Sequence, residues 1–111
     1  MLNKLLNKIK MKSNVFNKYV DKITVLFGVT KEELFSKTKR KEIVDPRQLL
    51  YYLCHKRPMS LKYIEIYMIE NGYYTKNSNI LYGVNAVIKR INEDEDYSKI
   101  IKEIEESVSI N

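Results

Sequence analysis

The fold is decided by residues 59–91, which read MSLKYIEIYMIENGYYTKNSNILYGVNAVIKRI. Ser60 is a favourable N-cap residue, so a helix is predicted to begin after it. Asn71 and Gly72 are typical of a helix end. The apolar residues between them recur at helical spacing, and they are Leu61, Ile64, Tyr67 and Met68.

A second helix is predicted at about 78–91, capped by Asn77 or Ser78. Two helices joined by a short turn that contains glycine have the size of a helix-turn-helix. Tyr73 and Tyr74 lie in the turn, where they either pack against it or stack on a sugar. The predicted apolar stripe of the second helix is Leu81, Val84, Ile88 and Ile91.

Toward the N-terminus, an amphipathic Lys-rich helix is predicted at 2–12. A break near Ser13 and Asn14 separates it from a helix at 14–27, which Gly28 ends. The predicted inward residues of these two helices are Leu2, Leu5, Leu6 and Ile9, then Val15, Tyr19, Ile23 and Leu26.

Two helices are predicted between Gly28 and Ser60. Thr30 and Glu33 form a capping box at the start of a short helix, about 31–36. After a basic loop at 37–44, Asp45 as N-cap and Pro46 in the first turn open a longer helix. The longer helix ends before Pro58, and its inward residues are Leu49, Leu50, Leu53 and Cys54.

The last helix is predicted at about 96–108, after the acidic residues 93–96. The fold class is therefore all-α, a single domain of about six helices that contains a helix-turn-helix. Three Gly and two Pro argue against a sandwich or barrel, which needs turns at short intervals. Residues 1–13 are predicted to form an amphipathic N-terminal helix, and residues 14–109 the helix-turn-helix domain. The inward residues of the last helix are Tyr97, Ile100, Ile101 and Ile104.

The composition excludes several classes of protein. One cysteine, Cys54, and one histidine, His55, cannot form a disulfide or a zinc cluster. As neighbours on a helix they point about 100° apart, so they do not make a nucleophile and base. Cys54 is expected in the core. The sequence therefore predicts no enzyme, no cofactor, no metal site and no small-molecule substrate.

The apolar runs are only a few residues long, and the N-terminal residues lack the apolar core of a signal peptide. We therefore expect a cytoplasmic protein that does not span a membrane. The amphipathic helix at 2–12 could lie on a membrane surface, but packing on its own domain or on a protein partner is the favoured interpretation.

Charge is spread unevenly over the chain. Residues 1–30 hold six Lys against one acidic residue, and residues 31–62 hold nine Lys or Arg against four. Residues 93–111 hold two Lys against seven acidic residues. A basic body with an acidic end favours a polyanionic partner, although a solvated surface is the alternative interpretation.

The candidate DNA contacts fall in two places. Cationic side chains in the loop and at the next helix start are expected on phosphates, and these are Lys37, Lys39, Arg40, Lys41 and Arg47. Exposed side chains at the start of the second helix of the motif are expected on base edges. These are Asn77, Ser78, Asn79 and Tyr82, and asparagine is suited to adenine. The alternative is that they are cap residues and solvated polar groups.

Three segments together resemble a known family. They read FSKTKRKEIVDPRQLLYYL (35–53), MSLKYIEIYM (59–68) and NSNILYGVNAV (77–87). In order and spacing they resemble the C-terminal DNA-binding domain of the bacterial replication initiator DnaA, from about Val15 to the final helix. The resemblance implies a TrpR-like helix-turn-helix that binds double-stranded DNA, as a stand-alone and divergent copy.

The resemblance also implies roles for single residues. Lys39 falls where the family has a minor-groove arginine, and Arg47 and Gln48 match a pair that contacts phosphate. His55 or Lys56 falls near a phosphate-contacting lysine. Leu61 and Lys62 match positions near a thymine methyl. The stretch Asn77, Ser78 and Asn79 matches the one that reads bases and phosphates in the major groove.

The departures from the family pattern change the expectation. The Asp-His pair of the family's second helix is absent, Glu65 replaces a glycine, and about four extra residues lengthen the turn. We therefore predict duplex binding without recognition of the family's usual box. The sequence shows no GxxxxGK[ST] loop, so the family's ATPase activity is not expected of it.

The predicted function is sequence-selective binding of double-stranded DNA, as a replication or transcription accessory factor. The alternative is an interaction or structural module, such as an adaptor or a virion component, that retains the fold without the DNA readout. The AT-biased residue usage suits a phage or mobile element in a bacterial cell.

Overall fold

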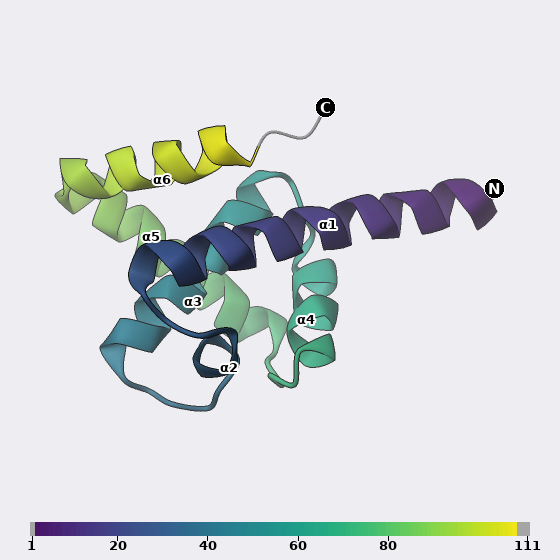
Figure 1. The fold of residues 1–111 in the computed structure, drawn as a ribbon, viewed down its shortest axis with the longest axis horizontal. Coiled ribbons are helices and arrows are strands. Elements are labelled where there is room, and N and C mark those ends of the chain that lie inside the picture. The colour runs from purple at the N-terminus through teal and green to yellow at the C-terminus, as the bar shows by residue number, and fades with distance from the viewer. Residues whose placement is uncertain (1, 109–111) are drawn as a thin grey trace.

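The computed structural model describes residues 2–108, and these residues form six helices and no strand (Figure 1). The predicted all-α class is confirmed. The helices are α1 (Leu2–Phe27), α2 (Lys31–Leu34), α3 (Lys41–Lys56), α4 (Leu61–Glu70), α5 (Asn77–Glu93) and α6 (Glu95–Ser107).

The first helix is continuous, so the predicted break near Ser13 and Asn14 is wrong. Neither residue is a strong helix breaker. Contacts of Ile9 and Lys12 before them, and of the Phe16 ring with Tyr67 after them, hold the helix against α4. The hydroxyl of Tyr67 donates to the carbonyl of Ile9 at 3.0 Å, and Lys12 lies over the ring of Tyr63 at 4.5 Å. Tertiary contacts therefore outweigh the weak local preference.

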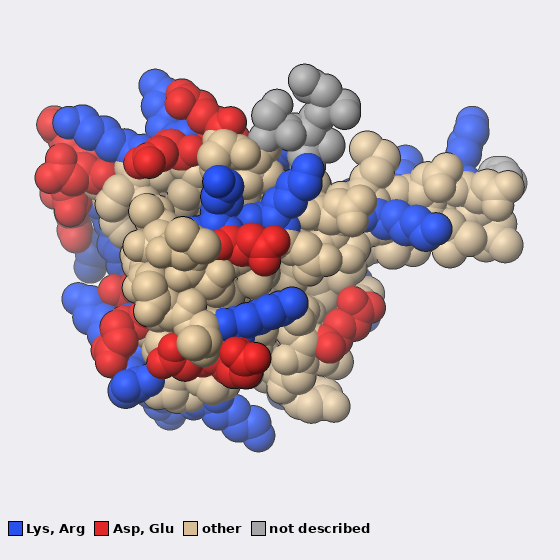
Figure 2. Space-filling view, in the orientation of Figure 1, with Lys and Arg blue, Asp and Glu red and all other residues tan. Residues whose placement is uncertain are grey.

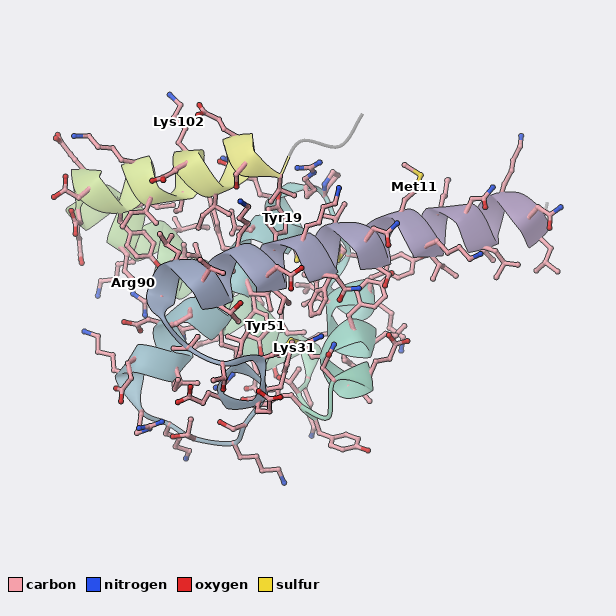
Figure 3. All side chains as sticks on the ribbon, viewed as in Figure 1. Met11, Tyr19, Lys31, Tyr51, Arg90 and Lys102 are labelled. Atoms are coloured by element: carbon pink, nitrogen blue, oxygen red, sulfur yellow. The ribbon has the colours of Figure 1, made fainter. Side chains whose placement is uncertain are left out.

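The N-terminal part of α1 projects beyond the other helices (Figure 1). Figure 2 shows lysine and no acidic side chain on the projecting end. In Figure 3, Met11 points away from the body. Three leucines that were predicted inward are exposed there, namely Leu2, Leu5 and Leu6.

The capping box of α2 is present as predicted, with Thr30 and Glu33 bonded to one another's backbone N–H. The predicted start of α3 is wrong. The helix begins at Lys41, so Asp45 and Pro46 lie inside it. The turn before Pro46 is closed by hydrogen bonds to the carbonyl of Arg40. Asp45 is free to pair with Arg90 of α5 at 3.0 Å.

The turn between α4 and α5 contains Gly72 at φ +87°, a backbone conformation that favours glycine. Ser60 caps α4 as predicted, because its hydroxyl accepts from the N–H of Tyr63. The predicted cap of α5 is wrong. The helix begins at Asn77, after Lys76 in extended conformation, so Asn77 and Ser78 are its first two residues.

The core lies where α3 packs against α1 and α5. Gly83 of α5 faces α3, and a Cβ there would lie 2.8 Å from the ring of Tyr51 and 3.2 Å from Cγ of Gln48. This close approach turns Ile80, Val84 and Val87 inward and leaves Leu81 and Ile88 half exposed. The buried face of α5 is therefore rotated about the helix axis, by part of a turn, from the predicted apolar stripe.

The last helix follows α5 after a single residue, Asp94, whose carboxylate accepts from the N–H of Asp96. Ile101 and Ile104 are buried as predicted. α6 lies on the side of α1 opposite to α2 and the loop that follows it (Figure 1). Over residues 2–108, no helix combines the length and the apolar character that crossing a membrane requires.

Candidate nucleic-acid interface

The loop between α2 and α3 is held in place by Arg47. Its guanidinium donates from Nε to the carbonyl of Leu34 at 2.9 Å and from Nη2 to that of Ser36 at 2.6 Å. Nη1 lies 3.5 Å from the carbonyl of Thr38. Carbonyls at and beyond a helix end lack helical partners, so the side chain satisfies groups that the fold leaves open.

The predicted phosphate contact of Arg47 does not fit this geometry. Because α3 begins at Lys41, Arg47 lies in its second turn rather than its first, and it points inward. Its side chain is only 4% exposed and covers the ring of Tyr73 at 4.5 Å. The charge of Arg47 therefore serves the loop rather than the surface.

A shallow groove separates this loop from the start of α5. Side chains from the loop, from α3 and from α5 meet there, although they are far apart in the sequence. The predicted contact residues that line the groove are Lys37, Lys39, Arg47, Gln48, Asn79 and Tyr82. The structure therefore brings cationic and base-reading candidates to one surface.

The wall of the groove is fixed by Tyr51. Its ring is buried against α5, and burial raises the pKa of its phenol, so the hydroxyl stays protonated at neutral pH. Thr75, which precedes α5, lines the groove beside Tyr51. Figure 3 shows Tyr51 inside the body. The ring of Tyr51 thus packs between α3 and α5.

Gln48 is held by a contact from α5. Nη2 of Arg90 donates to Oε1 of Gln48 at 2.6 Å and to the carboxylate of Asp45 at 3.0 Å. The three side chains are partly buried, so this ion pair is better shielded from water than the exposed pairs of the surface. The amide oxygen of Gln48 is therefore engaged inside the fold, whereas its other atoms border the groove.

The first turns of α5 are open to solvent. Asn77, Ser78, Asn79 and Tyr82 are all exposed. A second hollow borders the same turns, between Tyr74 and Lys76. The N-terminus of a long helix carries a partial positive charge, so this end of α5 and the lysines beside it favour an anionic ligand.

Two predicted cations lie next to the groove without lining it. Arg40 is exposed and pairs with Glu33 at 3.4 Å and with Glu42 at 3.5 Å. Exposed pairs of this kind exchange readily with solvent, so the guanidinium can reach a phosphate. Lys41 is exposed at the first position of α3.

Three further predicted contact residues, on α3 and α4, also lie outside the groove lining. Lys56 is at the far end of α3, where it pairs with Glu105 of α6 at 3.3 Å. Leu61 packs against the core, and Lys62 is exposed in the first turn of α4. The groove lining therefore holds part of the predicted set, and the DNA contacts themselves stay predictions.

Arg90 holds Gln48 at the border of the groove, a contact that the sequence does not reveal. It lies on an exposed-looking stretch, IKR, at the end of α5, and only the packing of α5 against α3 shows its partners. Pro46-Arg47-Gln48 was a usable signal for this region, but the pattern does not show which of the three side chains points inward.

Part of this surface is similar in sequence to a known family. A family model described as "Bacterial dnaA protein helix-turn-helix" matches residues 18–68. Residues 18–68 are therefore similar to the helix-turn-helix of DnaA. It is also similar to the chromosomal replication initiator protein DnaA 1 of Chlamydia trachomatis, with 27% identity over 86 residues.

The match to the Chlamydia trachomatis protein covers 75% of this chain and 18% of that protein, so the chain spans about a fifth of that relative's length. No solved structure matches the chain. The DnaA family model covers the α2–α3 loop and α3, and it stops within α4. The loop side of the groove thus lies within the family match, whereas α5 lies outside it.

Proposed function

We propose that this DnaA-like domain binds double-stranded DNA through the groove between the α2–α3 loop and α5. The observation that carries the proposal is the meeting of Lys37, Lys39, Asn79 and Tyr82 on one surface. Lysines on a rigid loop suit phosphates, and uncharged polar side chains at a helix start suit base edges. In the cell the protein would act as an accessory factor in replication or transcription.

The rigid mounting of the loop supports this proposal. Without Arg47, the backbone of Ser36–Thr38 would have to find other partners and would move in solution. A loop held by charge-assisted hydrogen bonds presents its lysines at a fixed separation from α5. Preorganised contacts lose less conformational entropy on binding than mobile ones do.

Fluorescence anisotropy with a labelled mixed-sequence duplex, at two salt concentrations, tests the proposal. Lys37→Glu with Lys39→Glu should weaken binding to all sequences and lower the salt dependence. Lys99→Glu with Lys102→Glu on α6 is the matched control, because it changes net charge equally on another face. No binding at low salt, or equal loss in both pairs, would contradict the proposal.

A second candidate function is a docking module, and the projecting end of α1 favours it. Leu2 is 69% exposed, and Leu5 and Leu6 are also exposed. Residues 1–13 would then be the docking element and residues 14–109 the DNA-binding domain. Affinity capture from a host extract compares the wild type with the triple serine variant of these leucines. A partner that the Lys37→Glu/Lys39→Glu variant retains and the serine variant loses supports docking; equal capture contradicts it.

A further inference from the structure

The exposed face of α5 carries no charge over three turns. From Asn77 to Ile88 the sequence holds asparagine, serine and apolar residues, and the first charge is Lys89. Solvated helix faces in a chain with 31% charged residues usually carry Lys or Glu. Exposure to solvent alone therefore does not explain why this face lacks charged residues.

The side chains of this face are ordered around the helix axis. At 100° per residue, Ser78, Tyr82 and Asn85 form its centre, opposite the buried Ile80, Val84 and Val87. Asn79 lies at the edge that borders the groove. Leu81 and Ile88, each 43% exposed, form the other edge.

Lysines border the face on its other sides. Lys37 and Lys39 lie across the groove from Asn79, and Lys76 and Lys89 lie before and after the uncharged turns. A duplex has this same division, with bases in the groove between two rows of phosphates. The arrangement fits a helix in the major groove whose centre meets bases and whose rim meets the backbone.

The chemistry of the centre distinguishes the base pairs. Asparagine donates to N7 and accepts from N6 of adenine, and apolar side chains contact the thymine methyl. Guanine is read best by Arg or Lys through O6 and N7. No residue of either kind lies between Lys76 and Lys89 on the described α5, so guanine would lose its best partner.

We propose that α5 selects A·T-rich duplex DNA in the major groove, with Asn79 and Asn85 reading adenine and Tyr82 contacting thymine methyls. This inference rests on the proposed function, because it concerns the same surface. Each adenine contact should favour A·T over G·C by about tenfold. The lysines contribute affinity without sequence preference.

Three duplexes of equal length, with A·T, G·C or inosine·cytosine pairs, test the inference by anisotropy. Inosine is guanine without its 2-amino group, so an inosine·cytosine pair resembles G·C in the major groove and A·T in the minor groove. We expect tight binding to A·T alone. If inosine·cytosine binds like A·T, the preference comes from the minor groove and the inference is wrong.

The other outcomes separate the inference from the proposed function. Equal binding of all three duplexes leaves duplex binding standing and overturns the A·T preference. Binding of none overturns both. Basic loops also favour the narrow minor grooves of A·T-rich DNA. The inosine·cytosine duplex therefore decides whether a preference for A·T comes from the major or the minor groove.

Single-atom changes in the DNA assign the contacts. Replacing adenine by 7-deazaadenine removes N7, and replacing thymine by uracil removes the methyl. Asn79→Ala with Asn85→Ala should bind A·T and 7-deazaadenine duplexes equally and leave G·C affinity unchanged. Tyr82→Ala should be insensitive to uracil, whereas Tyr82→Phe keeps the sensitivity.

Asn92→Ala, exposed at the other end of α5, is the matched control and should keep every preference. These side chains are solvent-exposed, so the variants should fold, and circular dichroism checks this. Wild-type sensitivity to 7-deazaadenine that survives both asparagine changes would overturn the assignment.

Discussion

At the residue scale, Arg47 places a guanidinium inside the protein without an acidic partner. Its buried positive charge is stabilised by hydrogen bonds to three backbone carbonyls of the segment from Leu34 to Thr38. Charge-assisted hydrogen bonds are roughly twice as strong as neutral ones, and a shared donor links three residues that would otherwise move separately. The side chain thus turns a short irregular segment into a rigid one.

Arg47→Met should lower the free energy of unfolding by about 2–4 kcal/mol, because three carbonyls lose a charged donor while the aliphatic stem remains. Urea denaturation followed by circular dichroism measures this loss. Lys39→Met is the matched control and should stay within about 0.5 kcal/mol of the wild type, since its side chain is exposed. Equal stability of the two variants would show that Arg47 does not hold the loop.

Glu33 provides a pH-dependent contribution to α2. Hydrogen bonds from the backbone and side chain of Thr30 lower the pKa of this carboxyl, so the folded state binds its proton more weakly than the unfolded state. The stabilisation is therefore present above the unfolded pKa and is lost as pH falls through the folded one.

The difference in melting temperature between wild type and Glu33→Gln should shrink as pH falls from about 6 to about 3. Glu106→Gln, which removes a carboxylate outside any capping box, controls for the general effect of charge. A difference that stays constant over this range would argue against the capping box as its source.

At the element scale, the packing of α5 against α3 depends on the absence of one side chain. Gly83 lets the helices approach so closely that even a methyl group would meet Tyr51. Helix propensity alone favours alanine over glycine by about 1 kcal/mol. The steric clash and the helix propensity of alanine therefore have opposite effects on stability at this position. Their relative sizes decide whether Gly83→Ala stabilises or destabilises the fold.

Gly83→Ala should lower the free energy of unfolding by about 1–2 kcal/mol, because overpacking exceeds the gain in propensity. Asn85→Ala, two residues along on the exposed face of the same helix, should raise it by a few tenths of a kcal/mol. Thermal unfolding of both variants decides the matter. A stabilised Gly83→Ala would show that Tyr51 moves aside at little cost.

The sequence predicted the helix ends that use local chemistry and missed those that use distant contacts. Thr30, Ser60 and Gly28 act through neighbours within four residues, so their roles follow from the pattern. Asp45 has the composition of an N-cap, but Arg90, 45 residues away, takes its carboxylate. No local pattern contains such a partner.

At the scale of the whole molecule, α1 is a helix with two different surroundings. Its second half contributes Phe16, Tyr19 and Ile23 to the core, whereas its first turns project into solvent. The contacts at Ile9 and Lys12 mark where the helix meets α4. The hydrophobic periodicity of residues 2–9 predicted burial, but Leu2, Leu5 and Leu6 are exposed, since an apolar stripe does not say what covers it.

Removing residues 1–7 should change the free energy of unfolding by less than about 0.5 kcal/mol, because the contacts of Ile9 and Lys12 remain. Removing residues 1–13 should cost about 1–2 kcal/mol, through the hydrogen bond from Tyr67 and the cation–π contact on Tyr63. Urea titrations of the two truncated chains measure the difference between their free energies of unfolding. Equal losses would mean that the projecting turns themselves stabilise the fold.

The site could be predicted from the sequence as a set of residues, and only in part as a geometry. The loop lysines and the start of α5 line one groove, an arrangement that the sequence alone does not show. Lys56 is directed to α6 instead, since its position near the end of α3 lies nine residues beyond Arg47. Spacing along a helix gives a direction, but the choice between solvent and a neighbouring helix depends on how the elements pack.

The acidic helix α6, across α1 from the loop, has a kinetic consequence. A molecule with one negative and one positive side has a dipole moment, and the field of a polyanion exerts a torque on it before contact. Approach with α6 first is repelled, so collisions are enriched in the orientation that brings the loop forward. The association rate should therefore fall with added salt more steeply than net charge alone predicts, because salt weakens the orientation as well as the attraction.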